Sequence, residues 1–242
     1  MIKLLARKLV NYLYLISLYF IYKFKISGIN NLRPLQFSDW AGNKTFFSGY
    51  IGDNKVFIKS QNRPKTYMRN EFAIMDVLKS NSEMVIFPKV LCCHDTLMGY
   101  AVVYEFIDAP TLDVFFSENP SYISDKDFVN NLTSQFINIL DVLYGNHIVH
   151  RDIRPGNLFV QNNRLILFDF AYSICLAPNM LREFNSKIER ELGQHYRAGL
   201  GYWNDVTSIL SVLEEHKIQI PAKQFKVLLD MESRISFNSK IK

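Results

Sequence analysis

The sequence predicts an α+β fold in which short antiparallel strands come first and helices follow. Three observations predict it. Residues 35–60 contain short strand-like runs separated by turn residues. Residues 99–107 form an almost wholly apolar run, typical of a central strand, which ends at Asp108-Ala-Pro110. Residues 127–145 carry apolar side chains at helical spacing.

Length and composition set the limits. A chain of 242 residues has room for one large domain or two small lobes. The formal charge of +5 is a mild excess, which fits attraction to an anionic membrane or substrate and predicts no nucleic-acid partner. The three cysteines of the chain are interpreted as reduced residues of a cytoplasmic protein. Cys92-Cys93-His94 does not predict a metal site, because neighbouring strand residues point to opposite faces.

Residues 1–33 are predicted to form a separate basic, apolar N-terminal helix. Residues 10–22 are almost wholly apolar and have lysines and an arginine on both sides. A membrane span needs about 20 apolar residues, so this stretch is short. No small-residue cleavage site follows it, which argues against a signal peptide. Three placements stay open: a helix in the membrane interface through residues 1–25, a helix packed on the fold, and a span.

Three strands are predicted at residues 35–40, 45–51 and 56–60, with loops at 41–44 and 52–55. A helix is predicted around residues 67–78, because Ile74, Met75 and Leu78 recur on one face. Two further strands are predicted at residues 87–91 and 99–107. The helix at 127–145 would be capped by Ser124 or Asp125 and would bury the following stripe: Phe128, Leu132, Phe136, Ile139, Leu140 and Leu143.

The chemistry is predicted to lie in the stretch from Ile148 to Phe170. Apolar runs at residues 158–160 and 165–168 flank Gln161-Asn162-Asn163, a pattern that indicates a hairpin. Such a hairpin would hold Asp152 and Asn157, which precede it, close to Asp169, which follows it. Two carboxylates and an amide are oxygen ligands of the kind that Mg²⁺ prefers.

The order His150-Arg151-Asp152, then Asn157, then Asp169-Phe170 resembles the catalytic and metal-binding signature of the protein-kinase-like superfamily. The resemblance implies a two-lobed fold, with an antiparallel-sheet N-lobe at residues 34–107 that carries one helix. A mainly helical, truncated C-lobe would follow at residues 108–242. It also implies ATP and Mg²⁺ as cofactors.

Site roles follow from the resemblance. In the C-lobe, Asp152 would orient the acceptor hydroxyl and Arg154 would contact the γ-phosphate, while Asn157 and Asp169 would hold Mg²⁺. Asp205 would bind the backbone around His150.

In the N-lobe, Lys59 would bind phosphates and pair with Glu71. Gly42 is the one glycine left of the phosphate-covering loop. Val103 would shape the back of the nucleotide pocket. The backbone of Glu105, Phe106 and Ile107 would bind the adenine edge.

The sequence also departs from the protein kinase pattern. Ala171 follows Asp169-Phe170 where the pattern has glycine, and no Ala-Pro-Glu occurs downstream. The short second lobe and the Arg-Pro-Gly-Asn loop resemble small bacterial lipopolysaccharide-core kinases of heptose or a related acid sugar. RIO-type kinases are also similar.

These features favour a kinase that phosphorylates a hydroxyl on a sugar of a lipopolysaccharide core or similar membrane glycolipid. It is expected in the cytoplasm, with contact on the inner face of the cytoplasmic membrane as an open question. Two alternatives remain: a small atypical serine/threonine kinase, and a nucleotide-binding pseudokinase scaffold.

Overall fold

The computed structural model of the chain describes residues 2–35, 44–61, 66–79, 86–96, 99–175 and 205–236. It divides into two compact units. The first comprises residues 1–72 and 89–107, and the second comprises residues 73–88 and 108–242. The predicted lobe boundary after Ile107 stays a prediction, but a unit boundary falls at the same residue.

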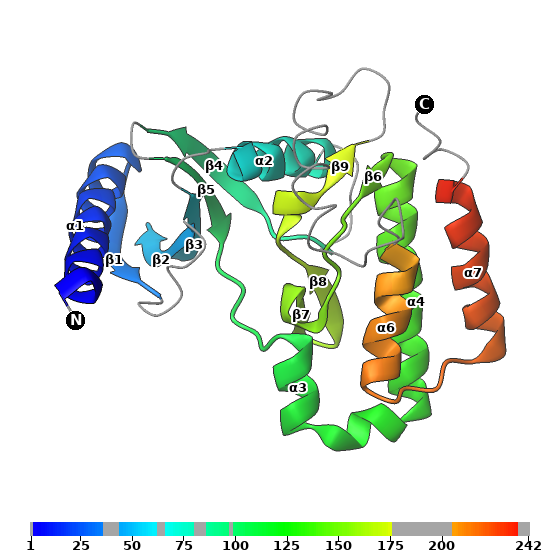
Figure 1. The fold of residues 1–242 in the computed structure, drawn as a ribbon. Coiled ribbons are helices and arrows are strands. Elements are labelled where there is room, and N and C mark those ends of the chain that lie inside the picture. Colours follow the sequence, from blue (N-terminus) through cyan, green and yellow to red (C-terminus); the bar gives the residue numbers. More distant parts are fainter. Residues whose placement is uncertain are drawn as a thin grey trace. The chain divides into compact units, whose positions relative to one another are not determined.

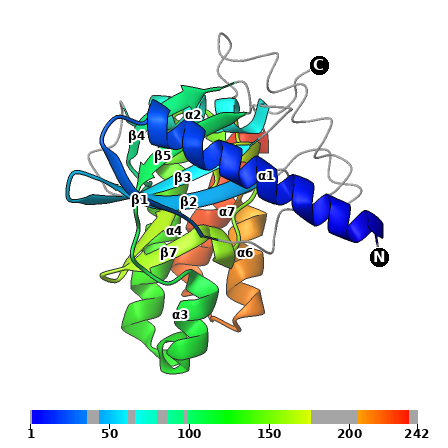
Figure 2. The ribbon, with the colours of Figure 1, turned by 90° about the vertical axis from the view of Figure 1, so that its left-hand side faces the viewer.

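The first unit is a five-stranded antiparallel sheet with a long helix on one face (Figures 1 and 2). The strand order is β1-β2-β3-β5-β4. Helix α2 begins in this unit and continues into the second. The elements are α1 (Ile2–Lys25), β1 (Ile29–Pro34), β2 (Lys44–Ile51), β3 (Asn54–Gln61), α2 (Thr66–Lys79), β4 (Val90–Asp95) and β5 (Tyr100–Glu105).

Helix α1 packs on the sheet and supplies part of its core. Leu15, Leu18 and Tyr22 are buried in one cluster with Phe47 and Ile58. The rings of Tyr22 and Phe47 meet edge to face, with centroids 5.5 Å apart. The structure describes the side chains of α1 from Tyr12 onward. Among these, the inner face is packed on the fold, which is one of the three placements left open above. No helix among the described residues is both long and apolar enough to cross a bilayer.

Two features differ from the prediction: β1 falls almost wholly within residues 1–33, which the sequence assigned to a helix, and the fourth strand is shifted along the chain. The first strand is Ile29–Pro34, because Ile29 and Leu32 are the side chains buried against α1, whereas Leu35 is exposed. The rest of the predicted strand, residues 36–40, lies outside the described residues. The fourth strand begins at Val90 rather than at residue 87. Pro88 has no N–H to donate to a ladder, and the Phe87 ring packs on Phe170 instead.

The second unit is mainly helical. Helix α4 carries the predicted apolar stripe on its buried face. The Asp125 side chain accepts hydrogen bonds from the N–H groups of Asp127 and Phe128, so it is the N-cap. The elements are α3 (Leu112–Glu118), η2 (Pro120–Ser124), α4 (Lys126–Gly145), β6 (Ile148–Val149), η3 (Pro155–Asn157), β7 (Leu158–Gln161), β8 (Arg164–Leu167), η4 (Phe170–Tyr172), β9 (Ile174–Cys175), α6 (Asp205–Glu215) and α7 (Ala222–Ser236).

Strands β7 and β8 form the hairpin that the sequence predicted. They pair in antiparallel register from Leu158↔Leu167 to Gln161↔Arg164. The two residues between them, Asn162 and Asn163, both have positive φ, 51° and 59°. Asparagine tolerates this region better than most residues, and two such angles in succession match the twist of a tight hairpin. The hairpin therefore fixes the residues at its open end.

Candidate active site

In the first unit, a buried lysine and a buried glutamate form an ion pair. Lys59 Nζ donates to Glu71 Oε2 at 2.6 Å, and both side chains are at most 1% exposed. Strand β3 positions the lysine and the first turns of α2 position the glutamate. A buried ammonium without a carboxylate partner would be strongly disfavoured, so the pair keeps Lys59 charged. A charged lysine is what phosphate binding requires.

Tyr104 on β5 completes this cluster, and the sequence analysis missed it. Its hydroxyl donates to Glu71 Oε1, so the carboxylate is held between the lysine and the phenol. Tyr104 lies opposite Phe57, two residues before Lys59 on β3, so it shares the face of the sheet with Lys59. Side chains alternate along a strand, so every second residue of β5, counted from Val102 opposite Lys59, shares the face of Lys59. Counting in this way could have identified Tyr104.

Val103 does not lie at the back of the candidate site, which corrects the sequence prediction. It is paired with Ile58 and buried with it in the core beneath α1. Since successive strand residues point to opposite faces, Val103 lies on the other side of the sheet from Lys59.

The segment predicted to bind the adenine edge, Glu105 to Ile107, lies at the end of β5, and two of its N–H groups already donate hydrogen bonds. Glu105 donates to the Lys89 carbonyl at 2.9 Å, and Phe106 donates to the Lys55 carbonyl at 3.1 Å. The Lys55 ammonium also lies 3.7 Å from the centre of the Phe106 ring. An adenine edge would therefore need other groups of the segment, such as the N–H of Ile107. Gly42 lies outside the described residues.

In the second unit, Asp205 at the start of α6 fixes the backbone before the candidate base. Its two carboxylate oxygens accept from the N–H of His150 at 2.7 Å and from the N–H of Arg151 at 2.8 Å. Complete burial raises the pKa of Asp205 to about 6, although the two N–H donors act in the opposite direction. The turn at Arg151 has a φ of 71°, so these bonds stabilise a left-handed conformation.

His150 has a structural role in this loop. Its Nδ1 accepts from the N–H of Asp152 at 3.2 Å, which leaves Nε2 to donate to the Phe168 carbonyl at 3.2 Å. Its ring packs edge to face on Phe170, with centroids 4.6 Å apart. Nδ1 therefore holds the loop's own turn, whereas Nε2 joins the loop to the end of the hairpin.

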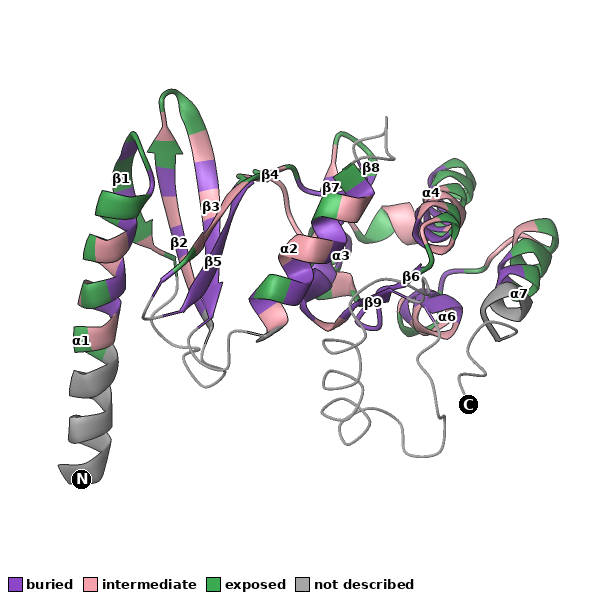
Figure 3. Cartoon of the chain, turned by 90° about the horizontal axis from the view of Figure 1, so that it is seen from above, coloured by how far each residue is buried: buried purple, intermediate pink, exposed green. Residues whose placement is uncertain are grey.

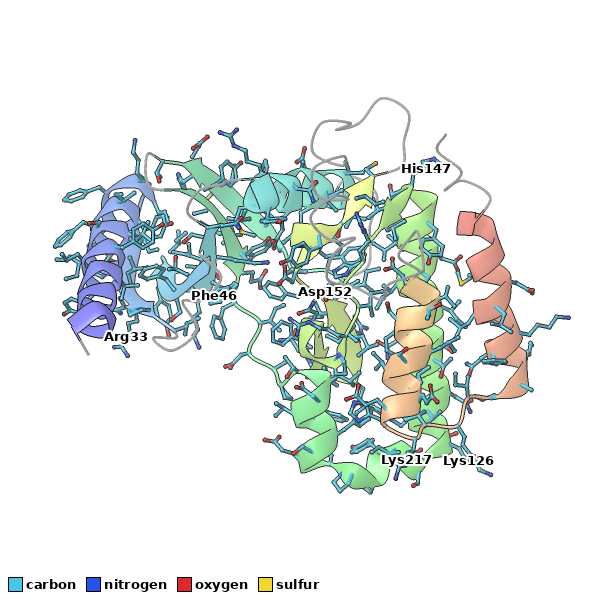
Figure 4. The ribbon with its side chains drawn as sticks, viewed as in Figure 1. Arg33, Phe46, Lys126, His147, Asp152 and Lys217 are labelled. Atoms are coloured by element: carbon cyan, nitrogen blue, oxygen red, sulfur yellow. The ribbon has the colours of Figure 1, made fainter. Side chains whose placement is uncertain are left out.

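Asp152 and Asn157 are in direct contact. The Asn157 side-chain nitrogen donates to both the carbonyl and Oδ2 of Asp152, each at 2.8 Å. Because the nitrogen end of the amide faces Asp152, its oxygen end is the atom left to act as a cation ligand. Arg154 is largely exposed, and its Nε lies 3.5 Å from Asp152 Oδ1. Figure 4 shows the place of Asp152 in its unit.

The hairpin brings Asp169 beside Asn157. The N–H of Phe168 donates to the Asn157 carbonyl at 2.9 Å, so Asp169 is the next residue along the chain from this contact. Asp169 is itself left-handed, with a φ of 67°, and its carboxylate accepts from the N–H of Ala171. Two carboxylates and an amide oxygen, supplied by adjacent backbone segments, form a donor set that fits Mg²⁺.

Comparison with known proteins identifies the class of protein. Residues 51–189, more than half of the chain, match the model of the protein kinase domain. The chain belongs to this family, whose members are phosphotransferases that act on hydroxyl groups.

Several curated kinases are similar to the chain. The probable serine/threonine-protein kinase PknB of Lactococcus lactis is 22% identical over 148 residues, covering 57% of this chain and 22% of that protein. Myosin light chain kinase A of Dictyostelium discoideum is 28% identical over 161 residues, covering 61% and 53%. Mouse cyclin-dependent kinase 4 is 29% identical over 110 residues, covering 43% and 36%. The matched segments span between about a fifth and a half of these relatives.

Proposed function

We propose that the chain is an ATP- and Mg²⁺-dependent phosphotransferase that phosphorylates a hydroxyl on a sugar of a membrane glycolipid, such as a lipopolysaccharide core. One observation carries the phosphotransfer part. The first unit contains the buried ion pair of Lys59 with Glu71. The second unit contains Asp152 hydrogen-bonded to Asn157, with Asp169 on the neighbouring segment. This set of groups suits a magnesium–nucleotide complex.

Each side chain has a defined task in this proposal. Asp152 accepts or orients the proton of the acceptor hydroxyl, and Arg154 contacts the transferred phosphoryl group. Lys59 binds phosphate oxygens, and Glu71 keeps its ammonium charged and in place. Bound Mg²⁺, held by Asn157 and Asp169, would neutralise charge on the phosphate oxygens. Gly42 and those backbone groups of Glu105, Phe106 and Ile107 that are not already hydrogen-bonded bind the remainder of the nucleotide.

Support for a membrane-borne acceptor comes from the outer face of α1. Residues along the side of α1 away from the sheet are exposed, green in Figure 3, whereas the inner face is packed on the sheet. Several of these exposed residues are large and apolar. Phe24 is 83% exposed, and three further members of the outer face are about half exposed: Tyr12, Leu13 and Phe20. A helix that is apolar all round needs a second apolar environment.

The charge of the same segment is complementary to an anionic membrane. The first acidic residue of the chain is Asp39, whereas six basic residues precede it: Lys3, Arg7, Lys8, Lys23, Lys25 and Arg33. Lys23 and Lys25 stand in the last turn of α1, next to Phe24. Basic residues beside exposed aromatic rings are typical of helices that lie in a membrane interface.

Vesicle sedimentation tests the membrane contact. The protein should sediment with phosphatidylglycerol vesicles more than with phosphatidylcholine vesicles, and Phe24→Glu should weaken that binding. Phe225→Glu, at a 42% exposed phenylalanine on α7, is the matched control. Equal binding by wild type and Phe24→Glu would refute the assigned surface.

Turnover with labelled ATP, Mg²⁺ and a glycolipid extract tests the reaction and its acceptor. Asp152→Ala should lower the rate by about 10²–10⁴-fold, the usual contribution of a positioned acid or base. Asp113→Ala, an exposed aspartate at the start of α3, is the control. Equal turnover in wild type and Asp152→Ala would reject the assignment of the base.

A second candidate is a small atypical serine/threonine protein kinase, because similar proteins such as PknB of Lactococcus lactis are described as probable serine/threonine-protein kinases. It predicts phosphate on protein rather than on lipid. Intact-mass measurement after incubation with ATP and Mg²⁺ separates the two, because autophosphorylation adds whole phosphoryl groups to the chain. A third candidate, a pseudokinase scaffold, predicts nucleotide binding with no turnover on either acceptor.

A further inference from the structure

The Glu71 carboxylate is held from two neighbouring strands at once. Lys59 on β3 donates to Oε2 at 2.6 Å, and the hydroxyl of Tyr104 on β5 donates to Oε1. Strands β3 and β5 are paired, with Tyr104 directly opposite Phe57, two residues before Lys59. Because each carboxylate oxygen has a donor from a different strand, a movement of α2 away from the sheet breaks both bonds together.

The phenol is itself fixed in place. Tyr104 is 1% exposed, and its ring lies beside the ring of Phe57, with centroids 6.3 Å apart. Phe57 is in turn stacked on Phe46 of β2, with centroids 5.8 Å apart. A side chain packed in this way has already lost its rotamer freedom on folding, so the hydroxyl is aimed at Glu71 before any ligand binds.

In protein kinases this ion pair is a point of control. The lysine and the glutamate must be together for phosphoryl transfer, and phosphorylation of the activation loop and the position of the glutamate's helix govern whether they are. In this chain, separating the pair would remove two hydrogen bonds from a carboxylate that is 1% exposed. A hydrogen bond to a charged group favours the bonded state by at least about tenfold, so the bond from Tyr104 shifts the equilibrium further towards the paired state.

We propose that Tyr104 is a positioning residue that keeps Glu71 bonded to Lys59 in the unmodified, nucleotide-free chain. The phosphate-binding lysine is then in place without an activating phosphorylation. The inference rests on the proposed function, because a lysine kept ready for phosphate matters only if the chain binds a nucleotide. Tyr104 acts through Glu71 and Lys59, and no contact between the phenol and the nucleotide is required.

Calorimetric titration of the full, phosphatase-treated chain with magnesium-bound ATP tests this role. Tyr104→Phe keeps the ring beside Phe57 and removes only the hydroxyl. It should weaken ATP binding by about tenfold, the effect of losing one hydrogen bond to a charged group. In a Glu71→Gln background the same change should alter the affinity by less than about twofold, because the ammonium has already lost the carboxylate through which the phenol acts.

Tyr100→Phe is the matched control. Tyr100 lies on the same face of β5 as Tyr104 and is 8% exposed, so this variant also removes a shielded hydroxyl from that face. Its ATP affinity should equal that of wild type. Equal losses in the two tyrosine variants, or an effect of Tyr104→Phe that is undiminished in the Glu71→Gln background, would indicate general destabilisation and overturn the positioning role.

Amide hydrogen exchange tests the permanence of the pair without a substitution. Residues 70–72, the part of α2 around Glu71 in the first unit, should exchange slowly in the ATP-free, phosphatase-treated chain. Added ATP should slow them no more than it slows α1 of the same unit. A selective slowing of α2 by ATP, or an ATP affinity that falls on phosphatase treatment, would overturn the proposal.

The outcomes separate this inference from the proposed function. Wild type that binds ATP, with no weakening in Tyr104→Phe, refutes the positioning role alone. Wild type that binds no ATP refutes the proposed function, and the positioning role with it.

Discussion

Replacing Glu71 by glutamine tests the buried ion pair most directly. The substitution keeps the shape of the side chain and an oxygen that can accept from Tyr104, but it removes the charge opposite Lys59. The ammonium then stays in a fully buried position without its carboxylate. We expect a loss of stability, because burial disfavours an ammonium that has lost its carboxylate partner.

The expected loss follows from the burial of both partners. Removing one member of a buried ion pair costs about 3–5 kcal/mol, because the remaining charge is desolvated. The Arg69–Asp95 pair in the same unit is the internal comparison, since its side chains are 45% and 42% exposed. For that pair, Asp95→Asn should cost at most about 1 kcal/mol.

Urea unfolding followed by circular dichroism measures the free energy of unfolding of each variant. The double variant Lys59→Met with Glu71→Gln should lose much less than the sum of the two single variants, because neither charge of this pair remains to be left without its partner. The reasoning fails if Glu71→Gln costs no more than Asp95→Asn, or if the double variant shows simple additivity.

Three further predictions concern single side chains. Tyr104→Phe removes a hydrogen bond to the buried carboxylate of Glu71 and should lower the free energy of unfolding by about 1.5–3 kcal/mol in urea titrations; no change would mean that the phenol contributes nothing. Asp125→Ala removes the N-cap of α4 and should cost about 0.5–2 kcal/mol, measured in the same way. The folded-state pKa of Asp205, about 6, lies above its unfolded value. The raised pKa therefore contributes up to about 3 kcal/mol to the free energy of unfolding below about pH 4. This contribution is lost as the pH rises through about 6. Stability curves against pH should show this slope in wild type relative to Asp205→Asn, and parallel curves would contradict it.

Local patterns predicted the elements that have one buried face. The stripe on α4 is unambiguous, because one side of that helix is apolar, and turn residues delimit β2 and β3. The Asn162-Asn163 turn was equally clear, since asparagine tolerates positive φ. Asp152, Asn157 and Asp169 were found together because the spacing around this hairpin brings them to one end.

The errors have two physical origins. Strand β5 is buried on both faces, so its sequence has no alternation that would tell which residues share a face with Lys59. Val103 was therefore assigned to the wrong side, and Tyr104 was overlooked. The strand at Ile29–Pro34 was not predicted, because Ile29 and Leu32 are separated by asparagines, which are rare in strands.

Helix α1 shows the same ambiguity, since an apolar segment beside basic residues can be read as an anchor alone. Its inner face, however, seals the hydrophobic interior of the sheet over Phe47, Val56 and Ile58. Recombinant expression that trims this segment as a supposed membrane tether would leave those three side chains open to water. Such a shortened product is expected to aggregate, so detergent or vesicles with the intact helix offer the better route to purified protein.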